Sequence, residues 1–377
     1  MKTLILSCNT GEGHNSCARA IKEYFDSKKE ECVIADGLEF ISHTTSDVMS
    51  RGHSYIYKHL PWLSRHGYNY AESHTAYYGE NTPLYKYFTQ GGDKLCRYIV
   101  VGGFDCVICT HVFTAFMLTR MLEDNPMNIS TCFVATDYST YPAIEKSNLD
   151  RYFVPDESLI GVYTERGIPR EKLTVSGIPV RKMFYEKCPI DEAKSAVGID
   201  PTHKHLLVMC GSMGCGPMKQ VLGVLSQKIG EKIDISVVCG NNSGLRNSLS
   251  RQYADQKNIR IRGYVDNMSL LMDSADLYLT KPGGISTCEA AQKELPMVLI
   301  DAVAGVEKYN MRHFVESGGA VTARTTSELC DLCLSLLKDD GIRARMKKNL
   351  SENKKLNAAA TVYDTMKEYE KAVKARV

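Results

Sequence analysis

The sequence predicts an α/β protein with two doubly wound domains, each built on a parallel sheet with helices on both faces. With 377 residues, the chain is longer than one ordinary core requires and suits two domains. Short apolar runs alternate with helical patterns along nearly all of it, as strands and crossover helices do. Two glycine turns, in TLILSCNTGEGHNSCARAI and KPGGISTCEAAQKELPMVLI, each lie between a strand pattern and a helix pattern. They predict two domains that each carry an anion-binding sheet edge.

The first domain is expected to span residues 1–180. Its strands are predicted at 4–8, 33–35, 106–110, 132–136, 152–154 and 173–176. Most of these runs are continuously apolar, which is typical of strands buried on both faces.

The second domain is expected to span residues 190–350. Its strands are predicted at 206–210, 235–239, 259–262, 277–280, 297–300 and 319–322. Pro179 and Pro189 interrupt the periodicity between the two series and indicate the boundary. Residues 351–377 are charged and helical without a strand, and we expect this segment to pack back on the first domain.

An insert at about residues 42–92 breaks the strand–helix alternation. It is rich in tyrosine and contains Trp62, the only tryptophan of the chain. Long inserts in compact domains are often functional, and Tyr and Trp favour surfaces that are wet on one side. The insert is either an aromatic helical subdomain packed on the first sheet or a membrane-contacting surface, and the two interpretations are compatible.

Composition excludes several classes of protein. The hydrophobic fraction of 44% and the charged fraction of 24% are typical of a soluble globular protein, and the net charge of +2 argues against a nucleic-acid binder. No apolar run reaches the ~18 residues of a membrane span, and the N-terminus does not resemble a signal peptide. Most of the 14 cysteines lie in apolar runs, which favours core packing in a reduced intracellular protein over zinc binding.

The first glycine turn carries a candidate for acid–base chemistry. His14 follows Gly11 and Gly13 at the start of a predicted helix, where the helix dipole favours a neutral imidazole that can accept a proton. Asp137 ends another strand at the same sheet edge, where it could orient His14 or contact an acceptor hydroxyl. The alternatives are that His14 only caps the helix and that Asp137 only caps a turn.

The second domain offers groups suited to a sugar nucleotide. The loop after the strand at 206–210 could bring backbone N–H groups to a diphosphate, and it lacks the GK[ST] ending of a P-loop. The helix after the second glycine turn offers a hydroxyl for a phosphate and a carboxylate for ribose hydroxyls. A polar loop after the next strand adds further hydroxyl-binding groups, and an arginine at the domain junction could neutralise a phosphate or form a linker salt bridge. In chain order these candidates are Arg181, Gly211, Ser212, Met213, Gly214, Gly283, Gly284, Ser286, Glu289, Glu307 and Asn310.

Several of these segments resemble a known family. TGEGHNSCARAI resembles the GGGHxxSA-type opening of monogalactosyldiacylglycerol synthases and processive diacylglycerol glucosyltransferases. VMCGSMGCG is similar to the diphosphate loop of that family, KPGGISTCEA to its ribose-binding segment, and AVAGVEKYNMRHF to its PGQExEN sugar loop. The similar segments occur in the family's order along nearly the whole chain. Val306 stands where the sugar loop of the family has glutamine.

The resemblance implies a GT-B fold, with a UDP-sugar in the C-terminal domain and a membrane lipid acceptor at the N-terminal domain. It also implies inversion at the anomeric carbon without a metal in the site and without a further cofactor. His14 matches the catalytic histidine of the family, Glu289 its ribose ligand and Glu307 a donor-hexose contact. Ser212, Ser286 and Arg181 match positions near the diphosphate.

The sequence therefore predicts an inverting glycosyltransferase that moves a hexose from a UDP-sugar to diacylglycerol or a related glycolipid. We expect a cytoplasmic protein held peripherally on the inner face of the cell membrane, with no nucleic-acid partner. One alternative is a UDP-sugar epimerase of the same fold, which would need no lipid. A second is a non-catalytic UDP-sugar sensor.

Overall fold

The protein folds into two compact units. The computed structural model describes residues 1–9, 11–59, 82–211, 214, 216–300, 305–354 and 357–374. Unit 1 comprises Met1–Lys182, Ala304–Val306 and Lys355–Val377, and unit 2 comprises Met183–Val303 and Glu307–Lys354.

Unit 1 is built on a parallel six-stranded sheet in the order β2-β1-β3-β4-β5-β6. Its strands are β1 (Thr3–Ser7), β2 (Cys32–Asp36), β3 (Cys106–Cys109), β4 (Ser130–Val134), β5 (Arg151–Val154) and β6 (Leu173–Val175). Every residue of β1, β3 and β4 is buried, because helices cover both faces of the sheet. The chain leaves β1 toward β2 on one side and places β3 on the other, so the strand order reverses between β1 and β3.

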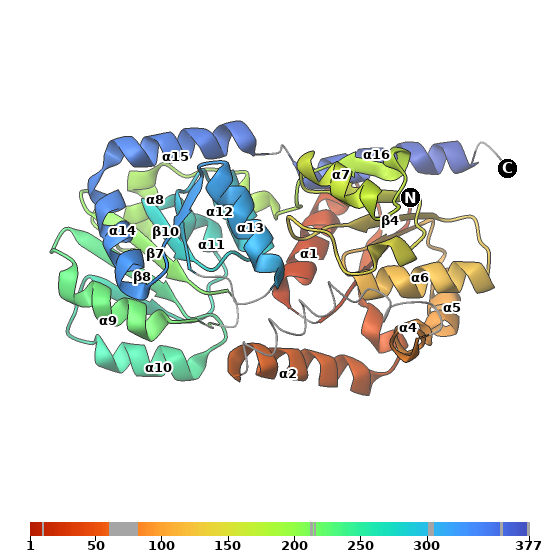
Figure 1. The fold of residues 1–377 in the computed structure, drawn as a ribbon, viewed down its shortest axis with the longest axis horizontal. Helices are drawn as coiled ribbons and strands as arrows, with labels where there is room; N and C mark the ends of the chain where they lie inside the picture. Colours follow the sequence, from red (N-terminus) through yellow and green to blue (C-terminus); the bar gives the residue numbers. More distant parts are fainter. Residues whose placement is uncertain are drawn as a thin grey trace. The chain divides into compact units, whose positions relative to one another are not determined.

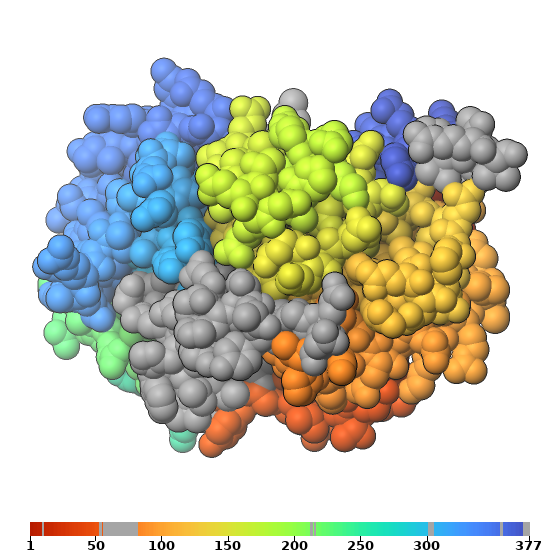
Figure 2. All heavy atoms as spheres, turned by 45° about the vertical axis from the view of Figure 1, so that its right-hand side comes forward, coloured from red at the N-terminus to blue at the C-terminus, as the bar shows by residue number. Residues whose placement is uncertain are grey.

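The helices of unit 1 form a layer on each face of the sheet. They are α1 (Glu12–Ser27), α2 (His43–His59), α4 (Pro83–Thr89), α5 (Gly92–Gly102), α6 (Val112–Asp124), α7 (Ser158–Glu165) and α16 (Ala358–Lys374), with 3-10 turns at Gly37–Phe40, Ile144–Lys146 and Arg170–Lys172. Helix α6 packs against α4 and α5, while α16 packs against α1 and β4 although it comes from the far end of the chain (Figure 1). Part of the dark-blue α16 is visible beside yellow residues of unit 1 in Figure 2.

Apolar side chains fix α16 on unit 1. Val362 and Met366 are fully buried, and the ring of Tyr363 meets that of Phe25 on α1 edge to face, with centroids 5.0 Å apart. Lys367 Nζ adds an ion pair to Glu30 at 2.7 Å. The last helix therefore contributes to the core of unit 1.

Unit 2 repeats the architecture with a parallel six-stranded sheet in the order β12-β11-β10-β7-β8-β9. Its strands are β7 (Lys204–Met209), β8 (Ile233–Val238), β9 (Ile259–Arg262), β10 (Leu277–Thr280), β11 (Met297–Leu299) and β12 (Ala320–Thr322). Here the strand order reverses between β7 and β10, and parallel α/β sheets bind ligands outside the carboxyl ends of strands at such a point.

The helices of unit 2 also cover both faces of their sheet. They are α8 (Ile190–Ala196), α9 (Met218–Lys228), α10 (Ser243–Gln252), α11 (Met268–Asp273), α12 (Gly284–Gln292), α13 (Gly305–Glu316), α14 (Thr326–Lys338) and α15 (Asp340–Asn353), preceded by a 3-10 turn at Lys182–Phe184. Helix α14 packs on α9, whereas α11 packs on α8 and α12 on α15.

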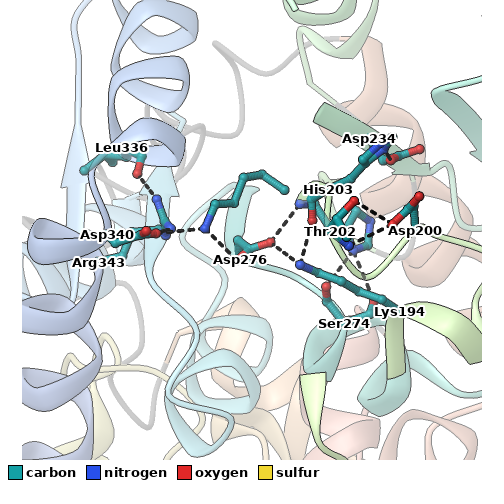
Figure 3. A network of polar contacts seen from close by, with 12 residues as sticks. Lys194, Asp200, Thr202, His203, Asp234, Ser274, Asp276, Leu336, Asp340 and Arg343 are labelled. Carbon is teal, nitrogen blue, oxygen red and sulfur yellow. Dashed lines mark hydrogen bonds and ion pairs between the residues drawn. The ribbon is translucent and has the colours of Figure 1, made fainter. Parts of the chain in front are cut away.

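A buried polar network joins the elements at the amino edge of the unit 2 sheet (Figure 3). The ammonium of Lys194, on α8, lies 2.9 Å from the Asp276 carboxylate, and both side chains are less than 10% exposed. Asp276 also accepts the backbone N–H of His205 at 2.8 Å. Lys204, the first residue of β7, extends the network, because its Nζ lies 2.8 Å from Oδ1 of Asp340 at the start of α15. The network ties α8, β7, β10 and α15 together at the edge opposite the carboxyl ends of the strands.

The predicted fold class is confirmed, and each predicted strand has a counterpart in one of the two sheets. The observed strands often stop one or two residues early. Thr110 and Thr136, predicted as the last residues of strands, follow β3 and β4 as loop residues at the carboxyl edge. Of the insert expected at 42–92, α2 and α4 are helical, while residues 60–81 with Trp62 lie outside the described residues.

The described cysteines are free thiols, and most are buried. Burial raises the pKa of Cys109 to about 12 and that of Cys330 to about 11, so both stay protonated. Cys96 and Cys188 are partly exposed. Across the described ranges there is no group of three or more His, Cys, Asp or Glu side chains that could hold a metal ion. Among the helices in those ranges, none is long and apolar enough to cross a membrane.

Candidate active site

His14 lies at the carboxyl edge of the unit 1 sheet, in the first turn of α1. Its Nδ1 is 2.7 Å from the carbonyl oxygen of Thr110, which follows β3. A carbonyl oxygen can only accept, so Nδ1 carries the proton and Nε2 has a free lone pair. The helix is capped by Gly11 without a side-chain hydrogen bond. The His14 side chain therefore bonds to the carboxyl edge of the sheet and does more than cap α1. Its tautomer is that of a base that accepts a proton at Nε2.

Asp137 reaches the same place from the loop after β4. Thr136 Oγ1 is 3.2 Å from His14 Nδ1 and 3.2 Å from Asp137 Oδ2. Tyr141 donates its hydroxyl to Asp137 Oδ2 at 3.1 Å and accepts the backbone N–H of Thr136 at 2.9 Å. The sequence pointed to His14 and Asp137 but missed Thr136 and Tyr141 as members of the cluster.

Opposing effects act on the pKa of His14. Burial lowers the pKa below 6.5, while the Asp137 charge and the hydrogen bond to the Thr110 carbonyl act to raise it. The net direction is downward, so the imidazole is neutral at neutral pH and can accept a proton. The ring of His111 stands edge to face against that of His14, with centroids 4.6 Å apart. His111 accepts the Phe113 N–H at Nδ1 and caps α6.

The glycines of the first turn leave the backbone open. A Cβ built on Gly11 would meet no atom within 4 Å, and Gly13 lies within the first turn of α1. The first turn of a helix presents unpaired N–H groups and the positive end of the dipole, which suits an anion or a developing negative charge.

Arg181 is engaged inside unit 1. Its Nε donates to Glu23 Oε1 on α1 at 2.8 Å, and the backbone N–H of Lys182 donates to the other oxygen of that carboxylate at 3.0 Å. This is the junction salt bridge considered as the alternative to phosphate binding. A phosphate role for Arg181 stays a prediction.

In unit 2, the loop after β7 requires glycine on steric grounds. Gly211 and Gly214 have φ angles of 72° and 56°, in the left-handed region. A Cβ on Gly214 would lie 2.2 Å from the Cys239 carbonyl oxygen, and one on Gly211 would lie 2.8 Å from Lys281 Cε. Ser212 and Met213, predicted at the diphosphate, lie outside the described residues.

The second glycine turn follows β10, the strand beside β7 at the point of reversal. Gly283 caps α12 and Gly284 is its first residue. Ser286 and Glu289 are three residues apart, so they share one face of the helix. Both are partly exposed between buried neighbours. That face is therefore the accessible side of α12 near its N-terminus.

Glu307 and Asn310 lie in the first turns of α13, and their side chains contact the loop that follows β10. Lys281 Nζ is 3.2 Å from Glu307 Oε1, and these side chains are only 13% and 6% exposed. Asn310 is fully buried and donates its amide to the Pro282 carbonyl at 3.0 Å. Lys281 was missed by sequence reasoning, although its place directly after β10 is the signal that identified the other candidates.

The candidate residues thus form two groups, one in each unit. The group in unit 1 holds a neutral histidine with an oriented carboxylate, which suits proton transfer. The group in unit 2 combines a glycine loop, a helix N-terminus and a lysine–glutamate pair, which suits a phosphorylated, hydroxyl-rich ligand.

Comparison with solved structures defines the class of fold. The chain aligns with MurG from Acinetobacter baumannii at a TM-score of 0.65 and 12% identity, over 98% of this chain and 100% of that chain. It aligns with MnaA from S. aureus in a co-structure with UDP at a TM-score of 0.62 and 15% identity, over 98% and 97% of the two chains. The protein has the two-domain GT-B fold of glycosyltransferases.

Family comparison narrows the class. Residues 14–180 match the family described as monogalactosyldiacylglycerol (MGDG) synthase, and residues 205–369 match the glycosyltransferase family 28 C-terminal domain. The chain is 27% identical over 379 residues to the processive diacylglycerol beta-glucosyltransferase of Bacillus subtilis (strain 168), over 98% of this chain and 96% of that relative. The chain is thus similar to monogalactosyldiacylglycerol synthases in its N-terminal part, to family 28 glycosyltransferases in its C-terminal part, and to processive diacylglycerol glucosyltransferases over nearly its whole length.

Proposed function

We propose that this protein is an inverting glycosyltransferase that transfers a hexose from a UDP-sugar to diacylglycerol or a related glycolipid. The observation that carries the proposal is the His14 tautomer, since the Thr110 carbonyl holds the proton on Nδ1 and leaves Nε2 as a base. The similarity to the processive diacylglycerol beta-glucosyltransferase of Bacillus subtilis supports the same reaction.

His14 takes the proton of the acceptor hydroxyl while the acceptor oxygen attacks the anomeric carbon of the donor. The bond from that carbon to the UDP oxygen breaks, so the configuration inverts and UDP leaves with the electron pair. Asp137 stabilises the imidazolium that forms. The backbone amides at Gly11 and Gly13 and the N-terminus of α1 offer positive potential to the acceptor side of the reaction.

Unit 2 binds the donor in this proposal. The loop from Gly211 to Gly214, with Ser212 and Met213, and the N-terminal turn of α12 at Gly283, Gly284 and Ser286 receive the diphosphate. Glu289 binds the ribose hydroxyls, Glu307 and Asn310 face the hexose, and Arg181 adds positive charge when it leaves Glu23. Amides, hydroxyls and cations thus stabilise the departing diphosphate, so the reaction requires no metal. The UDP in the S. aureus MnaA co-structure supports a UDP-linked donor.

The acceptor lipid places the protein at a membrane surface, and we propose peripheral attachment on the inner face of the cell membrane through the insert. On α2, Val48 is 62% and Tyr55 is 61% exposed, and the Arg51 side chain beside them is 85% exposed. Apolar and aromatic groups with an adjacent arginine suit an anionic lipid surface.

The test is turnover with UDP-glucose, UDP-galactose and UDP-N-acetylglucosamine, each with and without vesicles of diacylglycerol and anionic phospholipid. We expect one donor to give a glycolipid, and the protein to sediment with the vesicles. His14→Ala should lower turnover by about 10²–10⁴-fold while UDP affinity stays within about twofold. His313→Ala is the matched control, because that imidazole lies in the last turn of α13 and has no role in the proposed transfer.

The other outcomes identify the alternatives. Interconversion of donors without lipid would establish an epimerase, and UDP-sugar binding without turnover on any acceptor would establish a sensor. Wild-type turnover in the His14→Ala variant would refute the assignment of the base.

A further inference from the structure

We propose that Thr136 is a positioning residue that couples Asp137 to His14, with Tyr141 holding its hydroxyl in place. This inference rests on the proposed function, because it concerns the base of that reaction. It extends the proposal from a histidine–carboxylate pair to a four-residue relay.

The Thr136 hydroxyl lies between His14 and Asp137. Oγ1 is 3.2 Å from His14 Nδ1 and 3.2 Å from Asp137 Oδ2. The carboxylate is acceptor-only, so the Thr136 O–H points at Asp137 and the lone pairs of Oγ1 are available to the Nδ1–H of His14. That N–H is shared between the Thr110 carbonyl, at 2.7 Å, and Thr136 Oγ1.

The Thr136 hydroxyl transmits the electrostatic effect of Asp137 to the His14 imidazole. The negative Asp137 polarises the Thr136 O–H, which makes Oγ1 a stronger acceptor for the Nδ1–H. When Nε2 receives the proton of the acceptor, the imidazolium forms a stronger Nδ1–H hydrogen bond than the neutral ring. Thr136 therefore stabilises the charged form that develops during transfer, without contacting substrate.

Tyr141 fixes the rotamer of Thr136. Its hydroxyl oxygen accepts the Thr136 N–H at 2.9 Å, and its one hydrogen is shared between Asp137 Oδ2 at 3.1 Å and Thr136 Oγ1 at 2.8 Å, since the Thr136 hydrogen points at Asp137. The side chain is only 7% exposed. Burial and the nearby Asp137 charge raise the pKa of Tyr141 well above 10, so the phenol stays a neutral donor.

The relay is tested first without catalysis, by ¹⁵N NMR titration of histidine-labelled full-length protein. His14 is assigned by the signal lost in His14→Ala, and His111→Asn removes the neighbouring imidazole while keeping a side-chain acceptor for the cap. We expect the neutral wild-type ring to carry its proton on Nδ1. In Thr136→Val the midpoint should move to lower pH, in the same direction as in Asp137→Asn, while Thr136→Ser should restore the wild-type midpoint.

Kinetics supply the second readout. Thr136→Val should lower kcat about tenfold, leave KM for the UDP-sugar unchanged, and add little to the loss in Asp137→Asn. Thr136→Ser should recover most of the rate. Tyr141→Phe, which keeps the Thr136 hydroxyl, should cause a smaller loss and serves if the valine variant does not fold.

The outcomes separate this inference from the proposed function. An unchanged titration midpoint and unchanged kcat in folded Thr136→Val, or in Tyr141→Phe if valine is not tolerated, would overturn the relay. The relay would also be overturned if the kcat loss in the Thr136→Val/Asp137→Asn double variant equalled the product of the losses in the two single variants. A shifted midpoint together with full turnover in His14→Ala would leave the coupling intact and remove His14 from the reaction.

Discussion

Lys281 is the first residue of the KPGGISTCEA segment, but the sequence alone assigned it no role. It follows β10 directly, its stem packs on Gly211 of the neighbouring loop, and its ammonium pairs with Glu307. A lysine held between a glycine loop and a helix N-terminus provides positive charge where a diphosphate is proposed to bind.

Replacing Lys281 with Met should weaken UDP binding roughly tenfold or more, because a charge-assisted hydrogen bond contributes about 1.5–3 kcal/mol. Titration calorimetry with UDP measures the change. Lys308→Met, at an exposed position of α13, is the matched control. Equal UDP affinity in the Lys281 and Lys308 variants would show that Lys281 serves only to neutralise Glu307.

For single residues, the sequence predicted the place in the fold better than the side-chain contacts. His14 and Asp137 were recognisable because each follows a strand at a turn. Thr136 looked like the last residue of a strand, and Tyr141 like one of many tyrosines. Only the observed end of β4 at Val134 frees Thr136 to turn toward both partners. A hydroxyl between two charged or titratable groups has no sequence signature, since its role comes from three-dimensional neighbours.

Among the elements, the amino edge of the unit 2 sheet carries a pH-dependent part of stability. His205 is fully buried in β7, and its Nδ1 is 3.1 Å from the Ser274 carbonyl oxygen. Burial lowers its pKa to about 4. The unfolded chain binds a proton near pH 6.5 that the folded protein does not bind until about pH 4, so stability falls as pH decreases through that window.

The variant His205→Asn keeps a side-chain donor near the Ser274 carbonyl and removes the titration. Between pH 7 and pH 4 we expect the wild type to lose about 3 kcal/mol more unfolding free energy than this variant. Urea unfolding at several pH values gives the difference, and His43→Asn, at an exposed position, should retain the wild-type slope. Parallel curves for the wild type and His205→Asn would contradict the assignment.

Strand positions were predictable because continuous apolar runs leave few alternatives. Their ends were not, since Thr110 and Thr136 have side chains that suit strands and loops equally. The choice is made by pairing: Cys109 is the last residue of β3 that pairs with β1, and the Thr110 N–H makes one more hydrogen bond, to the Leu6 carbonyl at 3.0 Å, before the chain turns away.

For the whole molecule, the contribution of α16 to unit 1 has a measurable consequence. Deletion of residues 355–377 would expose the surfaces that Val362, Tyr363 and Met366 cover. Val362 and Met366 are fully buried, and each such side chain contributes about 1.5–3 kcal/mol. We expect scanning calorimetry to show unit 1 unfolding at lower temperature, with UDP binding by unit 2 retained. A control deletion of residues 375–377 should leave both properties unchanged. A wild-type unfolding profile in the longer deletion would exclude this role.

The two-sheet organisation follows from the alternation of apolar runs and helical patterns, and the places where strand order reverses follow from the sheet topology. The sequence could not specify these reversals, because strand order depends on how crossovers pack rather than on residue identity. Within unit 1 the reversal between β1 and β3 gathers the loops of its candidate group, and within unit 2 the reversal between β7 and β10 does the same for the other group.

The burial of the thiols makes the protein a convenient object for fluorescence spectroscopy. Among the cysteines in the described ranges, only Cys96, in unit 1, and Cys188, in unit 2, are partly exposed. With Cys215, which lies outside those ranges, changed to serine, maleimide dyes should attach at one native position in each unit. Energy transfer between the two dyes would then report, molecule by molecule, how the units move as donor and lipid are added.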